Sequence, residues 1–253
     1  MTTDVADLKA LAVKLRELHH GELLVLPNVW DAASAAIVAA AGFPAVATAS
    51  AAISAMLGYP DGEVAPWEEM FAAAGRVARA VPVPVTVDAE AGYGMRPREL
   101  VDRLLSTGAV GCNLEDTDHR AGGLSDAGEH ADWLAEVRAA ADAAGVPVVI
   151  NARVDTFLPP NGVPETDRVA ETIRRGRLYL DAGADCIYPI GVRAERDLAT
   201  LVTELPGPVN GNTGDELDLP ALRELGVARV SYGPRFYRAG LAGFKATVEK
   251  LQA

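Results

Sequence analysis

The chain alternates between short runs of β-branched residues and longer alanine-rich stretches with helical spacing of apolar positions. The short runs predict strands at residues 23–30, 44–50, 83–90, 109–116, 146–155, 184–190, 207–212 and 227–233. The longer stretches predict helices at about 31–41, 66–80, 97–107, 130–144, 165–182, 193–204, 218–225 and 234–251. Several of these helices end in Ala-Gly or Leu-Gly, as expected where glycine takes the left-handed conformation that ends a helix.

Eight strand-then-helix units predict a parallel sheet, because each strand is followed by a helix and not by a hairpin. In about 250 residues this pattern favours a closed (β/α)8 TIM-type barrel. The alternative is an open doubly wound sheet, although no GxGxxG follows the first strand. No linker divides the chain, so residues 1–253 are predicted to form one domain. The first 20 residues predict an extra N-terminal helix with Leu8, Leu11, Leu15 and Leu18 on one face.

The composition limits the kinds of molecule that the protein is expected to bind. The 23 Lys and Arg residues against 35 Asp and Glu residues give a net charge of −12, which argues against binding to nucleic acid or an anionic membrane. An anionic substrate is still compatible with this charge, because a local arginine or a bound metal can reverse the field at one site. The two cysteines, Cys112 and Cys186, and the lack of an apolar leader or spanning segment predict a soluble cytoplasmic protein.

Polar residues occupy alternate positions in the predicted strands, so those of one strand share one face. Because barrel active sites lie at the C-terminal ends of the strands, we expect these side chains to gather at one mouth. They are Thr86, Asp88 and Glu90, then Asn113 and Glu115, then Asn151, Arg153 and Asp155, and finally Asn210 and Asn212. The loop sequence GYPDGE adds Asp61.

Convergent carboxylates at such a mouth need a counter-charge to stay ionised together. Oxygen ligands without a nearby histidine favour Mg²⁺ or Mn²⁺, and Arg153 could then clamp a substrate carboxylate. The competing interpretation is that strand-end acids cap the following helices, which favours capping or supporting roles for Asp116 and Asp155. For Asp88, Glu90 and Glu115 together with Arg153, we favour the metal site.

Several segments, in this order, resemble the isocitrate lyase/phosphoenolpyruvate mutase superfamily. They are PNVWDAASA, the TAS turn followed by LGYPDGE, VTVDAEAGYG, GCNLED, INARVD and LGVARVSYGP. The resemblance covers roughly residues 21–245. It implies a (β/α)8 barrel, often with the last helix exchanged between subunits, in a homodimer or homotetramer.

The resemblance also implies a site. Mg²⁺ would be held chiefly by Asp88, with Asp61, Glu90 and Glu115 as direct or water-mediated ligands. A small 2-oxo acid or 2-hydroxy carboxylate would bind against the backbone amides of the Thr48-Ala49-Ser50 turn and against Arg153. Cleavage of a C–C or P–C bond would then pass through a metal-stabilised enolate. Asn210 is a further predicted substrate contact.

The chain departs from the family in the loop after the fourth strand. The lyases carry a KKCGH-type sequence with a catalytic cysteine there, and the mutases carry a lysine and an Asn-Ser pair, whereas this chain has TDHRAGGLSDAGEH. His119 is a candidate general acid in this loop, against the alternative of a solvated loop hinged at Gly122-Gly123. Tyr93 is a candidate proton donor, against the alternative of packing on the barrel rim. Cys112 and Cys186 are predicted to be core residues.

These residues lead to one expected function and two alternatives. The first is a Mg²⁺-dependent (or Mn²⁺-dependent) lyase that cleaves a C–C bond of a small oxo- or hydroxy-carboxylate. The second is a P–C bond mutase or hydrolase, for which only Arg120 and Arg153 offer a cation to accept the phosphoryl group. The third is a catalytically degenerate carboxylate-binding protein.

Overall fold

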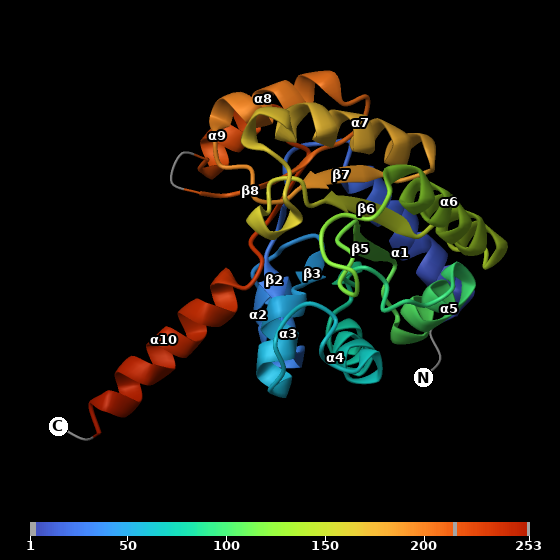
Figure 1. Ribbon diagram of the computed structural model, residues 1–253. Helices are drawn as coiled ribbons and strands as arrows, with labels where there is room; N and C mark the ends of the chain where they lie inside the picture. Colours follow the sequence, from blue (N-terminus) through green and yellow to red (C-terminus); the bar gives the residue numbers. More distant parts are fainter. Residues whose placement is uncertain (1–3, 215–216, 252–253) are drawn as a thin grey trace.

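The computed structural model describes residues 4–214 and 217–251 (Figure 1). The strands of these ranges pair in parallel only. They are β1 (Leu24–Leu26), β2 (Asn28–Val29), β3 (Val46–Thr48), β4 (Val85–Asp88), β5 (Gly111–Glu115), β6 (Val149–Val154), β7 (Cys186–Pro189), β8 (Asn210–Asn212) and β9 (Arg229–Ser231).

The strands close into a (β/α)8 barrel. β1 and β2 are two parts of one strand interrupted at Pro27, since β1 pairs with β9 while β2 pairs with β3. From β2 the order runs β3-β4-β5-β6-β7, and a parallel bridge between Ile187 and Val209 joins β7 to the segment leading into β8. β8 pairs with β9, and β9 returns to β1. The barrel predicted from the strand-helix alternation is therefore confirmed, and the open sheet is excluded.

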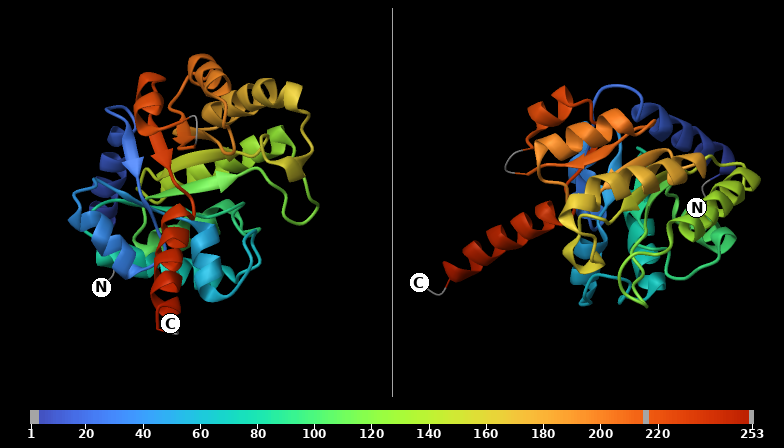
Figure 2. Two further views of the ribbon diagram at one scale, coloured as in Figure 1. Left: turned by 90° about the vertical axis from the view of Figure 1, so that its left-hand side faces the viewer. Right: turned by 45° about the horizontal axis from the view of Figure 1, so that its top comes forward.

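Helices surround the barrel (Figure 2). They are α2 (Ala32–Ala40), α3 (Ser50–Leu57), α4 (Trp67–Ala80), α5 (Pro97–Thr107), α6 (Ala127–Ala143), α7 (Arg168–Asp181), α8 (Glu195–Glu204) and α9 (Leu219–Glu224), with 3₁₀ turns at Pro159–Asn161 and Glu165–Asp167. α6 begins three residues before the predicted start at 130, because Asp126 caps it by accepting hydrogen bonds from the amides of Gly128 and Glu129. α3 was not predicted, since SAAISAML has apolar residues on every face.

The predicted N-terminal helix is α1 (Val5–Leu18). Leu8 and Leu15 on its apolar face are buried. Leu15 reaches Gly111 at the start of β5, where a Cβ on the glycine would lie 2.8 Å from a Leu15 methyl carbon. Arg16 pairs with Asp185, just before β7, at 2.7 Å. α1 therefore lies against the amino ends of the strands, opposite the predicted active-site mouth.

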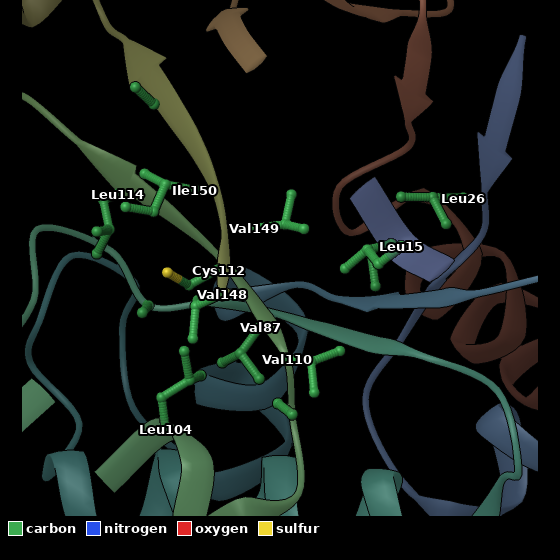
Figure 3. Packing of buried hydrophobic residues seen from close by; sticks show 14 of the residues in the cluster. Leu15, Leu26, Val87, Leu104, Val110, Cys112, Leu114, Val148, Val149 and Ile150 are labelled. Carbon is green, nitrogen blue, oxygen red and sulfur yellow. The ribbon is translucent and has the colours of Figure 1, made fainter. Parts of the chain in front are cut away.

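The hydrophobic core lies mainly between the strands and the surrounding helices (Figure 3). Val87, Cys112 and Ile150 project from three neighbouring strands, and Leu104 of α5 packs near them. Both cysteines are buried and free, and burial raises the pKa of each thiol to about 12. Both therefore stay protonated and serve as core residues. None of the helices in the described ranges is long and apolar enough to cross a membrane.

The last helix, α10 (Arg235–Glu249), projects away from the barrel (Figure 1). None of its residues is buried. Its first turn contacts the barrel through the ring of Tyr237, which meets Trp30 edge to face at 5.3 Å between ring centroids. Beyond that turn, Leu241 and Phe244 are 49% and 69% exposed. An amphipathic helix with an exposed apolar face needs another surface to cover it.

Candidate active site

Asp88 stands at the end of β4, beside the end of β3. The backbone amide of Asp88 donates to Thr48 Oγ1 at 2.9 Å. Its carboxylate Oδ2 accepts a hydrogen bond from the backbone amide of Ser50 at 3.0 Å. Ser50 is the first residue of α3, and Ala49 is the residue before it, so the carboxylate lies at a helix N-terminus, where the helix dipole stabilises a negative charge.

Asp61 lies in the same acidic environment. Burial raises the pKa of Asp61, the negative charge of Asp88 raises it further, and a hydrogen bond with Ser50 acts in the opposite direction. Asp61 and Asp88 therefore interact with each other and share Ser50 as a partner. Two carboxylates in this arrangement repel each other unless a proton or a cation lies between them.

Glu90 joins two loops at the mouth. Its Oε2 accepts from the backbone amide of Glu63 at 2.5 Å, and its Oε1 accepts from the phenol of Tyr93 at 2.5 Å. Glu63 in turn accepts from the backbone amide of Tyr93 through its own carboxylate. Burial raises the pKa of Glu90.

The same three residues carry unusual backbone conformations. Glu63, Glu90 and Tyr93 have φ values of +59°, +50° and +57°, and no other non-glycine residue of the described ranges has a positive φ. Each such conformation costs on the order of 1–3 kcal/mol and persists only where the surroundings impose it. The hydrogen bonds between the two loops supply that constraint. Strain gathered in this way is typical of functional sites.

Glu115, at the end of β5, has two basic neighbours. His119 Nε2 lies 2.7 Å from Glu115 Oε1, and Arg153 of the adjacent strand forms an ion pair with Glu115 Oε2. The hydrogen bond with Glu115 raises the pKa of His119. The His119 ring also lies over Gly62, where a Cβ would be 3.4 Å from Nδ1. The loop that contains His119 is thus folded over the mouth.

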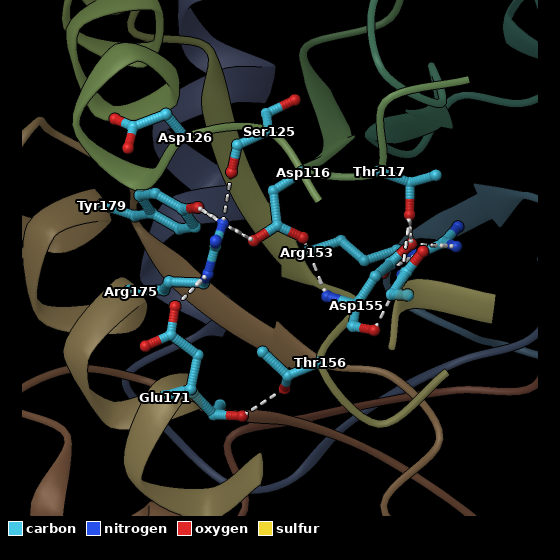
Figure 4. Close-up of polar contacts among 12 residues, drawn as sticks. Asp116, Thr117, Ser125, Asp126, Arg153, Asp155, Thr156, Glu171, Arg175 and Tyr179 are labelled. Atoms are coloured by element: carbon cyan, nitrogen blue, oxygen red, sulfur yellow. Dashed lines mark hydrogen bonds and ion pairs between the residues drawn. The ribbon is translucent and has the colours of Figure 1, made fainter. Parts of the chain in front are cut away.

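A buried network supports Arg153 and the base of this loop (Figure 4). Asp155 accepts two hydrogen bonds from the Arg153 guanidinium, at 2.6 and 2.7 Å, and one from the Thr117 hydroxyl at 2.6 Å. Asp116 accepts from the backbone amide of Asp155 and from Arg175 and Tyr179. These contacts are those of supporting residues, the role favoured for Asp116 and Asp155 from the sequence.

Asn210 is the predicted site residue in β8. It is fully buried, and its side-chain oxygen accepts hydrogen bonds from Asn151 at 3.2 Å and Ser231 at 3.0 Å. Asn151 also donates to Asn113, whose amide lies 3.4 Å from Asp88 Oδ1. A chain of hydrogen-bonded side-chain amides therefore connects Asn210 to Asp88. A direct contact of Asn210 with substrate stays a prediction.

The structure places the predicted metal-site residues near one another without direct convergence. Within residues 4–214 and 217–251, no group of three or more His, Cys, Asp or Glu residues could hold a metal ion directly. Glu90 and Glu115 use their oxygens on protein partners, as described above. Asp88 and Asp61 supply hard oxygen donors, and the repulsion between their negative charges calls for a counter-charge. These two features fit a divalent cation whose remaining ligands are water molecules.

Three functional candidates escaped the sequence analysis. Glu63 adjoins Asp61 in the GYPDGE loop, but only the fold shows that it holds Tyr93. Tyr188 pairs in register with Arg153, and its hydroxyl accepts from Asn212 at 2.9 Å. Arg229, in β9, is fully buried and donates to Asn113 at 3.1 Å. The polar position of Arg229 inside an apolar strand was the signal that could have identified it.

With this geometry established, comparison with known proteins identifies the family. The family model described as phosphoenolpyruvate phosphomutase matches residues 15–252. The chain belongs to the phosphoenolpyruvate mutase/isocitrate lyase superfamily.

Individual relatives differ in their described activities. An uncharacterized protein of Mycobacterium tuberculosis is 37% identical over 230 residues, covering 90% of this chain and 85% of that protein. An oxaloacetate decarboxylase of Bradyrhizobium diazoefficiens is 31% identical over 217 residues, covering 82% of this chain and 73% of that enzyme. A solved structure from Burkholderia cenocepacia, provisionally assigned as a phosphonomutase, is 39% identical with a TM-score of 0.86, covering 94% of this chain and 99% of that one. Lyases and mutases thus both occur among the relatives.

Proposed function

We propose that this protein is a Mg²⁺-dependent lyase that cleaves a C–C bond of a small 2-oxo or 2-hydroxy carboxylate. The observation that carries the proposal is the grouping of Asp88 and Asp61 at the start of α3, beside the Glu115–Arg153 pair on the next two strands. This grouping combines donors for a hard cation with a guanidinium that can bind a carboxylate.

Asp88 would hold Mg²⁺ (or Mn²⁺) directly, and Asp61, Glu90 and Glu115 would act through coordinated water. The bound cation supplies positive charge that stabilises an enolate oxygen. Substrate would enter with its carboxylate facing Arg153 and the Thr48–Ser50 turn. In the structure, the Ser50 amide is already bonded to Asp88, so Ala49 and the rest of the turn would provide the remaining contact.

His119 is the residue we assign to proton delivery. It is half-buried, and Glu115 holds its Nε2 at 2.7 Å and favours the protonated ring. When the C–C bond breaks, its electron pair remains on the enolate fragment, and the other fragment leaves as a carbonyl compound that has lost its hydroxyl proton, or as CO₂. A proton must then reach the carbanion carbon of the enolate fragment. Tyr93 is an alternative donor, but its phenol already donates a hydrogen bond to Glu90, and burial raises the Tyr93 pKa strongly.

A mutase or hydrolase acting on a P–C bond is the second candidate. The Arg120 guanidinium lies against Gly94 beside the Glu90–Tyr93 turn, where a cation could accept a phosphoryl group. The similarity to the provisionally assigned phosphonomutase favours this candidate. Release of inorganic phosphate from a phosphonate substrate would identify a hydrolase, and conversion of that substrate into an isomeric phosphate ester would identify a mutase; the lyase does neither.

Thermal unfolding with oxalate and Mg²⁺ tests the proposal. Oxalate resembles the enolate of pyruvate, because its two carboxylates stand for the carboxylate and the enolate oxygen. At concentrations about 100-fold above Kd we expect stabilisation of about 2.7 kcal/mol, or roughly 5–10 °C in Tm, only when both are present. No shift would show that these carboxylates do not form the Mg²⁺ and carboxylate site on which the lyase depends.

A further inference from the structure

Arg229 is a positively charged residue in the interior of the barrel. It belongs to β9, is fully buried, and donates from Nη2 to Asn113 Oδ1 at 3.1 Å. Asn113 belongs to β5, which lies opposite β9 in the barrel, since the strand order reaches it through β1, β2, β3 and β4 on one side and through β8, β7 and β6 on the other. The Arg229 side chain therefore crosses the barrel interior.

The fold alone does not require a positive charge at this position. Nε and Nη1 of Arg229 have no hydrogen-bond partner among the described residues, and within the same ranges Arg229 forms no ion pair with a carboxylate. A buried charge without a paired carboxylate destabilises the folded state. Asn113 does not depend on Arg229 for a partner, because its Oδ1 also accepts from Asn151 at 2.8 Å.

Asn113 connects this charge to the candidate active site. Its side-chain oxygen accepts from Arg229, and its Nδ2 donates to Asp88 Oδ1 at 3.4 Å. Asp88 therefore lies two hydrogen bonds from the guanidinium. Burial lowers the pKa of Arg229, and the negative charge of Asp88 opposes this shift. The guanidinium stays protonated at neutral pH, because the intrinsic pKa of arginine lies far above 7.

The charge of Arg229 also acts toward the other end of the barrel, where it finds a neutral group. His19 directly follows α1 and is buried, and burial together with the charge of Arg229 lowers its pKa to about 3. His19 is therefore uncharged at pH 7. The mouth is the end of the barrel at which the charge of Arg229 can act on a ligand.

We propose that Arg229 is a positioning residue of the candidate active site. Through Asn113 it supplies a fixed positive charge behind Asp88, and this charge favours an anion bound at the metal, including the enolate formed from substrate. The inference rests on the proposed function, because it takes Asp88 as the residue that holds Mg²⁺. It adds to that function a buried residue that acts without touching the substrate.

Such a charge has opposite effects on the two ligands of the site. It repels a cation and attracts an anion, so it lowers the affinity for the metal ion alone and raises the affinity for the anion that binds to the metal. A residue needed only for the shape of the site would change both affinities in the same direction. The two affinities therefore distinguish the proposed role from a structural one.

Ligand binding to the full-length variant Arg229→Met tests the proposal. Methionine is unbranched and uncharged, so it can fill the same space without a buried charge. Calorimetry measures the affinity of oxalate and of its singly charged analogue oxamate in saturating Mg²⁺, and electron paramagnetic resonance measures the affinity of Mn²⁺ alone. At about 3-fold per unit of ligand charge, we expect oxamate to bind about 3-fold and oxalate about 10-fold more weakly than to wild type. Mn²⁺ should bind at least as tightly as to wild type, and Tm should not fall.

Arg79→Met is the matched control. It removes the same charge from an exposed position in the last turn of α4, where solvent screens it, and should leave all three affinities within about twofold of wild type. The role of Arg229 would be overturned by equal losses for oxalate and oxamate, by an unchanged affinity for oxalate, by weaker Mn²⁺ binding, or by an Arg229→Met chain that does not fold. Failure of oxalate and Mg²⁺ to bind wild type would overturn the proposed function itself.

Discussion

At the scale of single residues, the sequence indicated which side chains would share the barrel mouth but not their partners. Strand alternation placed Asp88, Glu115 and Arg153 at the C-terminal ends, where the structure has them. The alternation determines on which face of a strand each side chain lies. It does not determine which neighbouring residue a long side chain will contact. The Glu115–Arg153 ion pair and the Glu90–Tyr93 hydrogen bond therefore became visible only in the fold.

The first residue-scale prediction concerns Asp88. Asp88→Ala should abolish turnover and the Mg²⁺-dependent stabilisation by oxalate, because the carboxylate at the start of α3 is the principal predicted ligand. Tm without ligands should change by only a few degrees, since Asp88 is half-buried and belongs to no ion pair in the described ranges. Asp102→Ala, at an exposed position on α5, is the control and should behave like wild type. An active Asp88→Ala protein would refute the site assignment.

The second concerns His130, whose pKa burial lowers from 6.5 to about 4. The unfolded chain binds a proton at pH values where the folded chain does not, so stability falls as the pH drops from about 6.5 toward 4. The loss from this group is about 3 kcal/mol at most, from about 1.4 kcal/mol per pKa unit. His19, whose pKa burial lowers to about 3, adds to the same trend.

Urea unfolding at a series of pH values measures this effect. His130→Phe should reduce the slope of stability against pH between 6.5 and 4, because Nε2 of His130 has no hydrogen-bond partner in the described ranges and the ring packs against Trp133 and Tyr179. Lys9→Phe, at an exposed position on α1, should leave the slope unchanged. An unchanged slope in His130→Phe would show that this histidine does not titrate as burial requires.

At the scale of elements, the periodicity of apolar positions identified most of the surrounding helices. It missed α3, whose sequence has no such periodicity. α4 and α5 match their predicted ranges within one residue, because polar and apolar positions alternate strongly along them. α3 lacks such a pattern: Ala52, Ile53 and Ser54 are consecutive and all buried. Its position directly after β3 is what brings a helix N-terminus to Asp88, a tertiary relation that no local pattern encodes.

α10 carries the element-scale prediction. We propose that its exposed apolar face packs on another subunit, in a homodimer or homotetramer, as the family resemblance implies. Phe244→Glu should lower the mass measured by light scattering during gel filtration, because it places a charge in that face. Ala246→Glu adds the same charge on the opposite side of the helix and should not. A wild-type chain that elutes as a monomer would contradict the proposal.

At the scale of the whole molecule, the closed barrel was predictable because eight repeated units leave few other arrangements. Net charge was a weaker guide. The value of −12 describes the chain, yet a cavity near Tyr188 is lined by three arginines. Such a local reversal of charge depends on which loops lie next to each other in the fold. The net charge is a sum over the whole chain and does not reveal it.

The pairing of β1 with β9 also determines the stage of protein synthesis at which the barrel can first close. Leu24 is matched with Arg229, so the barrel cannot close until a ribosome has made and released residues up to about 231 of 253. Until then β1 and β8 have unpaired edges, which in other chains recruit wrong partners. Contacts of such long sequence separation also slow folding. A nascent chain of this protein therefore cannot close its barrel before the last strand is made. Its unpaired strand edges favour aggregation until then.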